Sequence, residues 1–169
     1  EGQLQHFGLA ILLVAGTLNL LVPGPEASEL LGLTSAGWAK LSIALAVIHQ
    51  IIVALVFRLQ LHRNLLTRWF GKHDMAIWRI IFLPLLVARP LTVLMTGWAG
   101  STDITGVRPI ELLAGVTLLG LAIWAMHSVV VYFTLPRALG GNHFRDSYAA
   151  MPLVDKGVFK HTSNGMYGI

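Results

Sequence analysis

Four runs of apolar residues, each near the length needed to cross a lipid bilayer, constrain this chain more than any other feature of its sequence. They occupy residues 7–22, 38–60, 75–98 and 110–133. A helix of about 20 apolar residues covers roughly 30 Å of hydrocarbon. The first run is the shortest and contains Asn19. The sequence therefore predicts an all-α, multi-pass transmembrane helical bundle with four spans.

Composition supports a membrane protein and excludes several kinds of chemistry. Charged residues make up 12% of the 169 residues, about half of the roughly 25% typical of soluble domains. The chain contains no cysteine. Disulfide frameworks, thiolate metal sites, iron–sulfur clusters and cysteine nucleophiles are therefore excluded. We predict no metal site.

The distribution of Lys and Arg predicts the orientation of the spans, because short basic loops stay in the cytoplasm. The loop at 23–37 has no basic residue, and the loop at 99–109 has only Arg108. The other two connecting segments are basic: Arg58, Arg63, Arg68 and Lys72 in the first, and Arg137, Arg145, Lys156 and Lys160 in the second. We therefore expect an integral membrane protein whose N-terminus and C-terminal tail are cytoplasmic. The basic residues follow this topology, so no nucleic-acid partner is indicated.

The first run differs from a secretory signal because only Glu1 and His6, and no Lys or Arg, precede it and no small-residue cleavage motif follows it. We interpret it as a true span. The chain then divides into a transmembrane part, 1–133, and a polar tail, 134–169. Aromatic and basic side chains in the tail favour the cytoplasmic membrane interface.

Ionisable residues inside spans are costly and need either a partner or a function. Arg89 and the neighbouring pair His49 and Gln50 lie at similar expected depths, which predicts a structural pair with His49 or Gln50 as the acceptor. His49 and His127 together also suggest a protein that binds haem or handles isoprenoids. Their expected depths differ by roughly 9 Å, which disfavours a haem held between them.

The tail contains the most informative stretch, Leu153-Val154-Asp155-Lys156-Gly157-Val158-Phe159-Lys160. It resembles the cytoplasmic motif of the integral-membrane methyltransferases that act on phospholipids and isoprenylated cysteine. The residues that match this motif are Leu153, Val154, Gly157, Val158, Phe159 and Lys160, followed by Met166-Tyr167. Where the family has Arg-His-Pro, this chain has Ser163-Asn164-Gly165. The segment from Ala125 to Arg145 is similar to the helix and linker that precede the motif.

The resemblance implies a function: methyl transfer from S-adenosylmethionine to a lipid-borne acceptor, either a phospholipid amine or a prenylcysteine carboxylate. It implies a cofactor site formed by Gly141, Asn142, Val154, Gly157, Phe159, Asn164 and Tyr167. The candidates for the catalytic base are His127, His143 and His161, whose ordinary pKa lies near neutrality. Membrane lipid is the expected partner, with head-group phosphates contacting Arg137, Arg145, Lys156 and Lys160.

The family's domain continues with a further helix and paired acidic residues, whereas this sequence stops at Ile169 as that helix would begin. We therefore expect either part of a longer chain or a shortened relative. Two alternatives to the enzyme remain open. One is a non-catalytic methyltransferase-like subunit of a larger membrane complex, and the other is the haem- or isoprenoid-handling protein.

Overall fold

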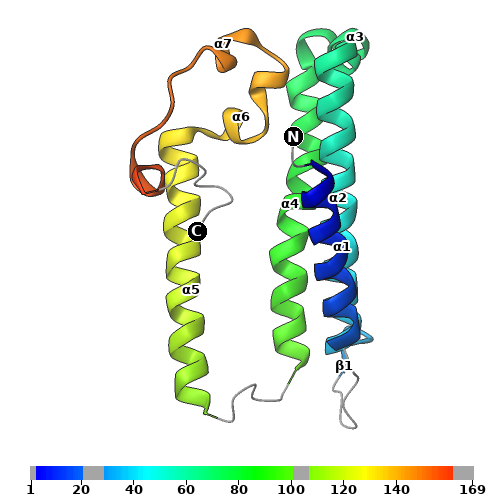
Figure 1. The fold of residues 1–169 in the computed structure, drawn as a ribbon, viewed down its shortest axis with the longest axis vertical. Coiled ribbons are helices and arrows are strands. Elements are labelled where there is room, and N and C mark those ends of the chain that lie inside the picture. The colour runs from blue at the N-terminus through cyan, green and yellow to red at the C-terminus, as the bar shows by residue number, and fades with distance from the viewer. Residues whose placement is uncertain (1–2, 21–28, 101–106, 162–169) are drawn as a thin grey trace. The chain divides into compact units, whose positions relative to one another are not determined.

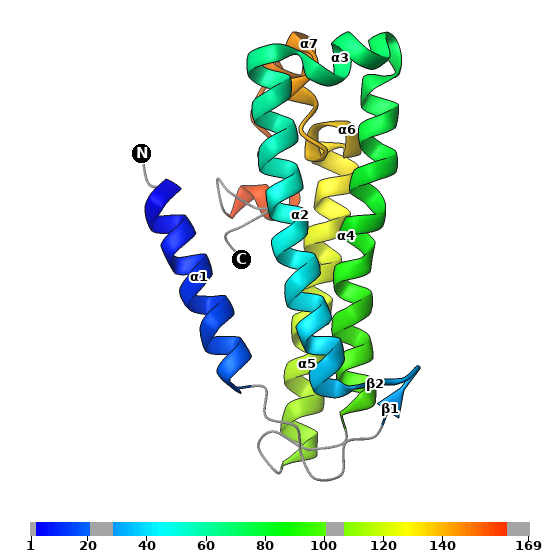
Figure 2. The ribbon, with the colours of Figure 1, turned by 90° about the vertical axis from the view of Figure 1, so that its right-hand side faces the viewer.

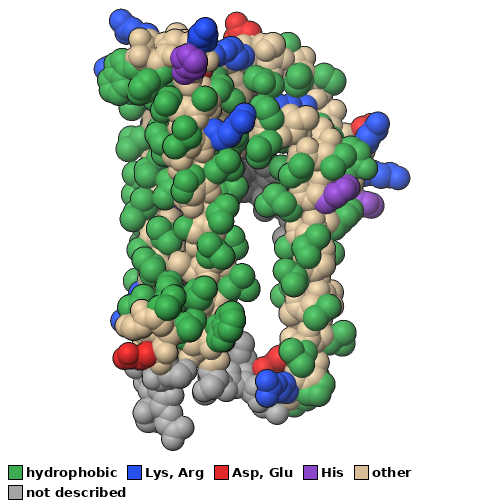
Figure 3. All heavy atoms as spheres, turned by 180° about the vertical axis from the view of Figure 1, so that it is seen from behind, with side chains coloured by type: hydrophobic (Ala, Val, Ile, Leu, Met, Phe, Trp, Pro, Cys, Tyr) green, Lys and Arg blue, Asp and Glu red, His purple; other side chains and the backbone are tan. Residues whose placement is uncertain are grey.

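The computed structural model describes residues 3–20, 29–100 and 107–161, and this part of the chain is mostly helical (Figure 1). Three helical segments are long and apolar enough to cross a membrane: Ser35–Arg63, Leu65–Ala99 and Arg108–Phe133. Within them lie the helices α2 (Ser35–Arg63), α4 (Asp74–Ala99) and α5 (Arg108–Ser128). Their apolar side chains are largely exposed and cover much of the surface (Figure 3). A surface of this kind suits a hydrocarbon solvent.

The second and third predicted spans, 38–60 and 75–98, correspond to α2 and α4 within about three residues at each end. The fourth, 110–133, corresponds to α5 together with the π-helical turn Val129–Phe133 that follows it. The first predicted span, 7–22, falls on α1 (Gln3–Leu20), whose apolar part, Gly8–Asn19, is shorter than the three others. Four spans are therefore not confirmed, and the crossing by α1 stays a prediction. The last two residues of this predicted span, 21 and 22, lie outside the described residues.

The chain divides into two compact units, and residues 1–53 with 81–102 form the first. Here β1 (Glu29–Leu30) and β2 (Leu33–Thr34) form a small antiparallel hairpin just before α2 (Figure 2). The indole Nε1 of Trp38 donates a hydrogen bond to the carbonyl of Leu30 at 3.0 Å. The hydroxyl of Ser35 donates one to the carbonyl of Thr96 at 2.8 Å, which ties the start of α2 to the end of α4.

His49 lies within the same unit, where it is only 5% exposed. Its ring and that of Phe82 pack in a T-shaped arrangement, with 4.9 Å between centroids. Neither imidazole nitrogen has a hydrogen-bond partner among the described residues, and Gln50 is exposed. The predicted hydrogen bond from Arg89 to His49 is therefore wrong, and the imidazole packs against an aromatic ring instead.

The second unit contains residues 54–80 and 103–169. A short helix, α3 (Leu65–Phe70), and the 3-10 turn η1 (Gly71–His73) connect α2 to α4, where the sequence had predicted only a loop. After α5, a π-helical turn, η2 (Val129–Phe133), precedes a folded segment of short helices. These are α6 (Leu135–Ala138), η3 (Gly141–His143), α7 (Asp146–Ala149) and η4 (Gly157–Lys160).

The core of the second unit holds this segment in place. Trp78, Leu139 and Val158 are each at most 1% exposed. The indole Nε1 of Trp78 donates to the carbonyl of Leu139 at 2.8 Å, so a buried donor is satisfied where α4 begins. Phe57 of α2 and Trp78 pack in a T-shaped arrangement, with 5.6 Å between ring centroids. The segment is therefore a packed part of the unit.

Candidate functional site

A chain of polar side chains spaced seven residues apart organises the turn between α2 and α4. Asn64 breaks α2 with a left-handed backbone (φ 48°) and provides no side-chain cap for α3. The Gln60 side chain supplies the missing acceptor, because its Oε1 receives the N–H of Leu66 at 3.0 Å. Its Nε2 donates to the Thr67 hydroxyl at 2.6 Å, and Thr67 in turn donates to the Asp74 carboxylate at 2.5 Å.

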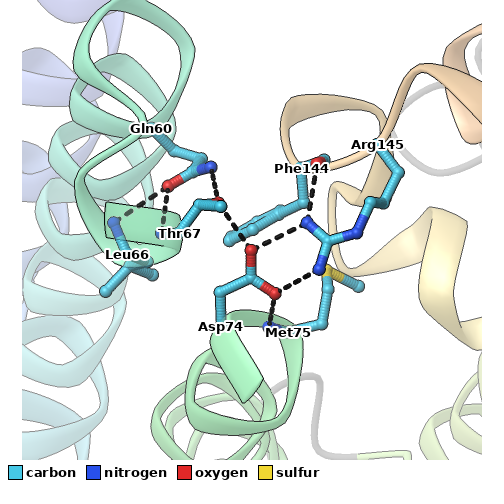
Figure 4. Close-up of polar contacts among 7 residues, drawn as sticks. All are labelled: Gln60, Leu66, Thr67, Asp74, Met75, Phe144 and Arg145. Carbon is cyan, nitrogen blue, oxygen red and sulfur yellow. Dashed lines mark hydrogen bonds and ion pairs between the residues drawn. The ribbon is translucent and has the colours of Figure 1, made fainter. Parts of the chain in front are cut away.

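Asp74 connects this turn to the segment that follows α5 (Figure 4). Both guanidinium Nη atoms of Arg145 donate to its carboxylate, at 2.6 and 2.7 Å. The Met75 N–H donates to the same carboxylate at 2.6 Å. Asp74 is fully buried, whereas the Arg145 side chain is 37% exposed. Gln60, Thr67, Asp74 and Arg145 are called the polar network below.

The charge of the buried carboxylate acts on its partner. The hydrogen bonds from Arg145 to Asp74 raise the pKa of the guanidinium above its ordinary value. Paired, bidentate geometry of this kind is among the stronger polar contacts in proteins. Arg145 is therefore held by the protein itself, and its predicted contact with a lipid phosphate would have to share the guanidinium with Asp74.

His143 lies in the same region, stacked on the Phe57 ring with 4.3 Å between centroids. Its Nδ1 is buried and has no hydrogen-bond partner among the described residues. Burial lowers the pKa of His143 below its ordinary 6.5, because desolvation disfavours the charged imidazolium. The imidazole is thus kept neutral against an aromatic ring.

We expect this burial to make stability depend on pH. The unfolded chain takes up a proton on His143 near pH 6.5, and the folded chain does so only at lower pH. The contribution of the neutral ring is therefore complete above 6.5 and decreases as the pH falls toward the lower folded pKa. Unfolding measured in detergent between about pH 5 and 8 should show this loss, and His143→Phe should reduce it while keeping the stack. An unchanged pH profile in the variant would contradict the assignment.

The stretch that resembles the methyltransferase motif packs against the end of α5. The Val158 N–H donates to the hydroxyl of Ser128 at 3.1 Å, and that hydroxyl donates to the Trp124 carbonyl at 2.9 Å. Ser128 is fully buried. Gly157 has a φ of +60°, and a Cβ there would lie 2.8 Å from the Ser128 Cβ. Only glycine suits such a backbone and so close an approach.

Aromatic rings surround this contact. Phe133 and Phe159 stack at 5.3 Å between centroids, and the Arg137 guanidinium lies 4.7 Å from the Phe133 ring centre. His161 lies 5.9 Å from Trp124, and His127 lies 6.4 Å from Tyr132, both between ring centroids. Trp124, His127, Tyr132 and His161 are called the aromatic face below. All four are exposed.

The structure separates the predicted catalytic histidines. His161 lies against Trp124, and Trp124 is one helical turn before His127. His143 instead packs on Phe57, away from the aromatic face. In η4, Gly157 lies close to Ser128 and Tyr132, and Phe159 stacks on Phe133. Val154 is half-buried and Asn142 is exposed. Gly141 is buried, and a Cβ there would meet the Pro136 carbonyl at 2.7 Å.

The close approaches at Gly141 and Gly157 are thus to protein atoms, whereas the sequence suggested a close approach to a ligand. Asn164 and Tyr167 lie outside the described residues. Of the predicted head-group residues, Lys156 and Lys160 are exposed. Arg137 donates to the carbonyl of Pro152 at 3.1 Å, and Arg145 belongs to the polar network.

Sequence reasoning missed Asp74, Gln60 and Ser128. A signal for the first two was present, because 60, 67 and 74 are polar positions at seven-residue intervals, and Asp74 is an acidic residue beside a basic loop. Ser128 offered none, since a serine near the end of an apolar helix usually bonds its own backbone. Among the described residues, no group of three or more His, Cys, Asp or Glu is arranged to hold a metal ion.

The fold and these contacts define a helical protein with three segments able to cross a membrane and a packed segment after the third. No protein-family model matches the chain. No curated protein and no solved structure matches it either.

Proposed function

We propose that this protein transfers a methyl group from S-adenosylmethionine to a lipid-borne acceptor, a phospholipid amine or a prenylcysteine carboxylate, at the cytoplasmic membrane interface. The observation that carries the proposal is the packing of Gly157–Lys160 onto the end of α5. The same residues carry the resemblance to the membrane methyltransferases. Gly157 has a left-handed backbone and lies so close to Ser128 that a side chain there would disturb the packing. This supports a specific structural role for the motif.

The aromatic face has chemistry that suits the cofactor. S-adenosylmethionine supplies an electrophilic methyl group on a sulfonium cation. Aromatic ring faces attract cations, and Trp124 and Tyr132 are exposed rings at the end of an apolar helix. These two residues would hold the sulfonium, with Phe159 and Gly157 beside them.

The histidines of the same face suit the acceptor. A phospholipid amine arrives protonated and must lose its proton before it can attack the methyl group. His127 and His161 are exposed imidazoles, so each is able to accept that proton. A carboxylate acceptor needs no base, and positioning alone would then provide the acceleration. The proposed cytoplasmic orientation rests on the basic residues of the turn between α2 and α4 and of the segment that follows α5.

Calorimetric titration of the purified chain in detergent tests this function. We expect saturable binding of S-adenosylmethionine and tighter binding of its demethylated product. Trp124→Leu should weaken cofactor binding about 2- to 30-fold, because a desolvated cation–π contact contributes roughly 0.5–2 kcal/mol. His73→Ala, which changes an exposed histidine far along the chain in η1, is the control and should bind as the unmodified chain does.

Binding that Trp124→Leu and His73→Ala leave equally unchanged would remove the aromatic face from the cofactor site. No binding by the folded chain would overturn the enzymatic proposal and favour the non-catalytic subunit. If the chain binds the cofactor, incubation of lipid extracts with labelled cofactor would then identify the class of acceptor.

A further inference from the structure

The turn between α2 and α4 presents basic and aromatic side chains outward. This basic turn, residues 62–73, contains α3 and η1. Trp69 is 68% exposed and Phe70 is 40% exposed, although both are large and apolar. The basic side chains of the turn are also exposed: His62, Arg63, Arg68, Lys72 and His73. Figure 3 shows Lys, Arg and His side chains gathered where α2 and α4 meet this turn.

The polar network fixes which side of the turn faces outward. Leu66 is 7% exposed, and its N–H is held by Gln60. Thr67 is held between Gln60 and Asp74. Because these two positions face inward, Arg68 and Trp69 are directed away from the unit. The polar network therefore determines which side chains the turn exposes.

The positive charge of the turn has no exposed acidic neighbour within the same stretch. Residues 62–73 contain three Lys and Arg residues and no Asp or Glu. Asp74, which follows them, is fully buried and paired with Arg145. The buried carboxylate therefore does not offset the charge that the turn presents to its surroundings.

The turn lies where the segments Ser35–Arg63 and Leu65–Ala99 meet, and both are long and apolar enough to cross a membrane. We therefore expect the turn at a membrane boundary. Aromatic and basic side chains at such a boundary meet lipid chains and head groups, respectively. We propose that the basic turn binds the anionic head groups of phospholipids, with Trp69 and Phe70 inserted among them at the interface. The proposal does not depend on methyl transfer, and its residues differ from those proposed for the acceptor lipid.

Fluorescence quenching in nanodiscs tests the proposal. Discs of equal phosphatidylglycerol and phosphatidylcholine are prepared with bromine on the chains of one lipid at a time. The chain has five tryptophans, so the signal of Trp69 is taken as the difference between the unmodified chain and Trp69→Phe. We expect brominated phosphatidylglycerol to quench Trp69 more strongly than brominated phosphatidylcholine, and less selectively at high salt.

The variant Arg68→Gln/Lys72→Gln should lose this selectivity. Each basic residue near an anionic surface contributes about fivefold to association, so removal of two lowers the preference by up to about 30-fold. The matched control is Lys40→Gln/Arg108→Gln, which removes two charges near the starts of α2 and α5 and should keep the selectivity. Both substituted side chains of the test variant are exposed, so folding should be preserved.

Three results would overturn the proposal. Equal quenching by both lipids in the unmodified chain would show that the turn has no head-group preference. Absence of quenching by either lipid would place Trp69 in water or against a protein partner. Equal loss of selectivity in the test and control variants would assign the effect to overall charge.

Discussion

Replacement of Arg145 by methionine is expected to lower the free energy of unfolding by about 3 kcal/mol, because removal of one partner leaves a buried charge uncompensated. Asp74 is fully buried and would keep only the donors of Thr67 and Met75. Unfolding by denaturing detergent in mixed micelles, followed by tryptophan fluorescence, measures the change.

The reverse substitution provides the control. Asp74→Asn leaves Arg145 without its ion pair, but this side chain is 37% exposed and can be hydrated. The loss should therefore be smaller, about 1 kcal/mol. The double variant should be more stable than Arg145→Met alone, since no buried charge remains. Equal losses in the two single variants would contradict the asymmetry that the burial of Asp74 implies.

Replacement of Gly157 by alanine is expected to release η4 from the end of α5, at a cost of about 3 kcal/mol. The added Cβ would collide with the Ser128 side chain and lie 2.9 Å from the Tyr132 ring. Overpacking of this kind typically costs 1–3 kcal/mol, and the left-handed backbone adds strain. Trypsin should then cleave faster after Lys156 and Lys160, because a released segment fits a protease better than a packed one.

Gly115 is the matched control, since nothing lies within 4 Å of a Cβ built there in α5. Gly115→Ala should leave cleavage unchanged and stabilise the helix by up to about 1 kcal/mol. If Gly157→Ala is cleaved no faster than this control, the packing of η4 on Ser128 does not hold the segment. Cofactor binding measured on the same two variants shows whether that packing also matters for the proposed site.

The apolar runs predicted the long helices well because the bilayer sets the length of a crossing segment. Three of the four runs match helices of the structure: Ser35–Arg63, Asp74–Ala99, and Arg108–Ser128 with its π-helical turn. The first run is ambiguous, because Gly8–Asn19 is short for a span. Hydropathy reports how apolar a helix is, but it does not decide whether a helix close to the minimum spanning length crosses the bilayer.

The contacts of the candidate site could be predicted only in part. Composition predicted an interfacial tail, but the pairing of Asp74 with Arg145 joins residues 71 positions apart. Many arginines in the chain were equally plausible partners. The approach of Gly157 to Ser128 depends on a left-handed backbone that many glycines could adopt. Local sequence patterns cannot specify such contacts, because tertiary packing selects them.

The separation of Asp74 and Arg145 along the chain also has a consequence for synthesis. Gln60, Thr67 and Asp74 are close together in sequence and can meet as soon as the α2–α4 hairpin has emerged. Arg145 follows 71 residues later, which corresponds to roughly 4–14 s at 5–20 residues per second. During that interval the carboxylate lacks the Arg145 guanidinium that binds it in the folded chain. The α2–α4 hairpin is therefore synthesised before the partner of its acidic residue. The ion pair between Asp74 and Arg145 forms only after α5 and the first part of the tail have been made.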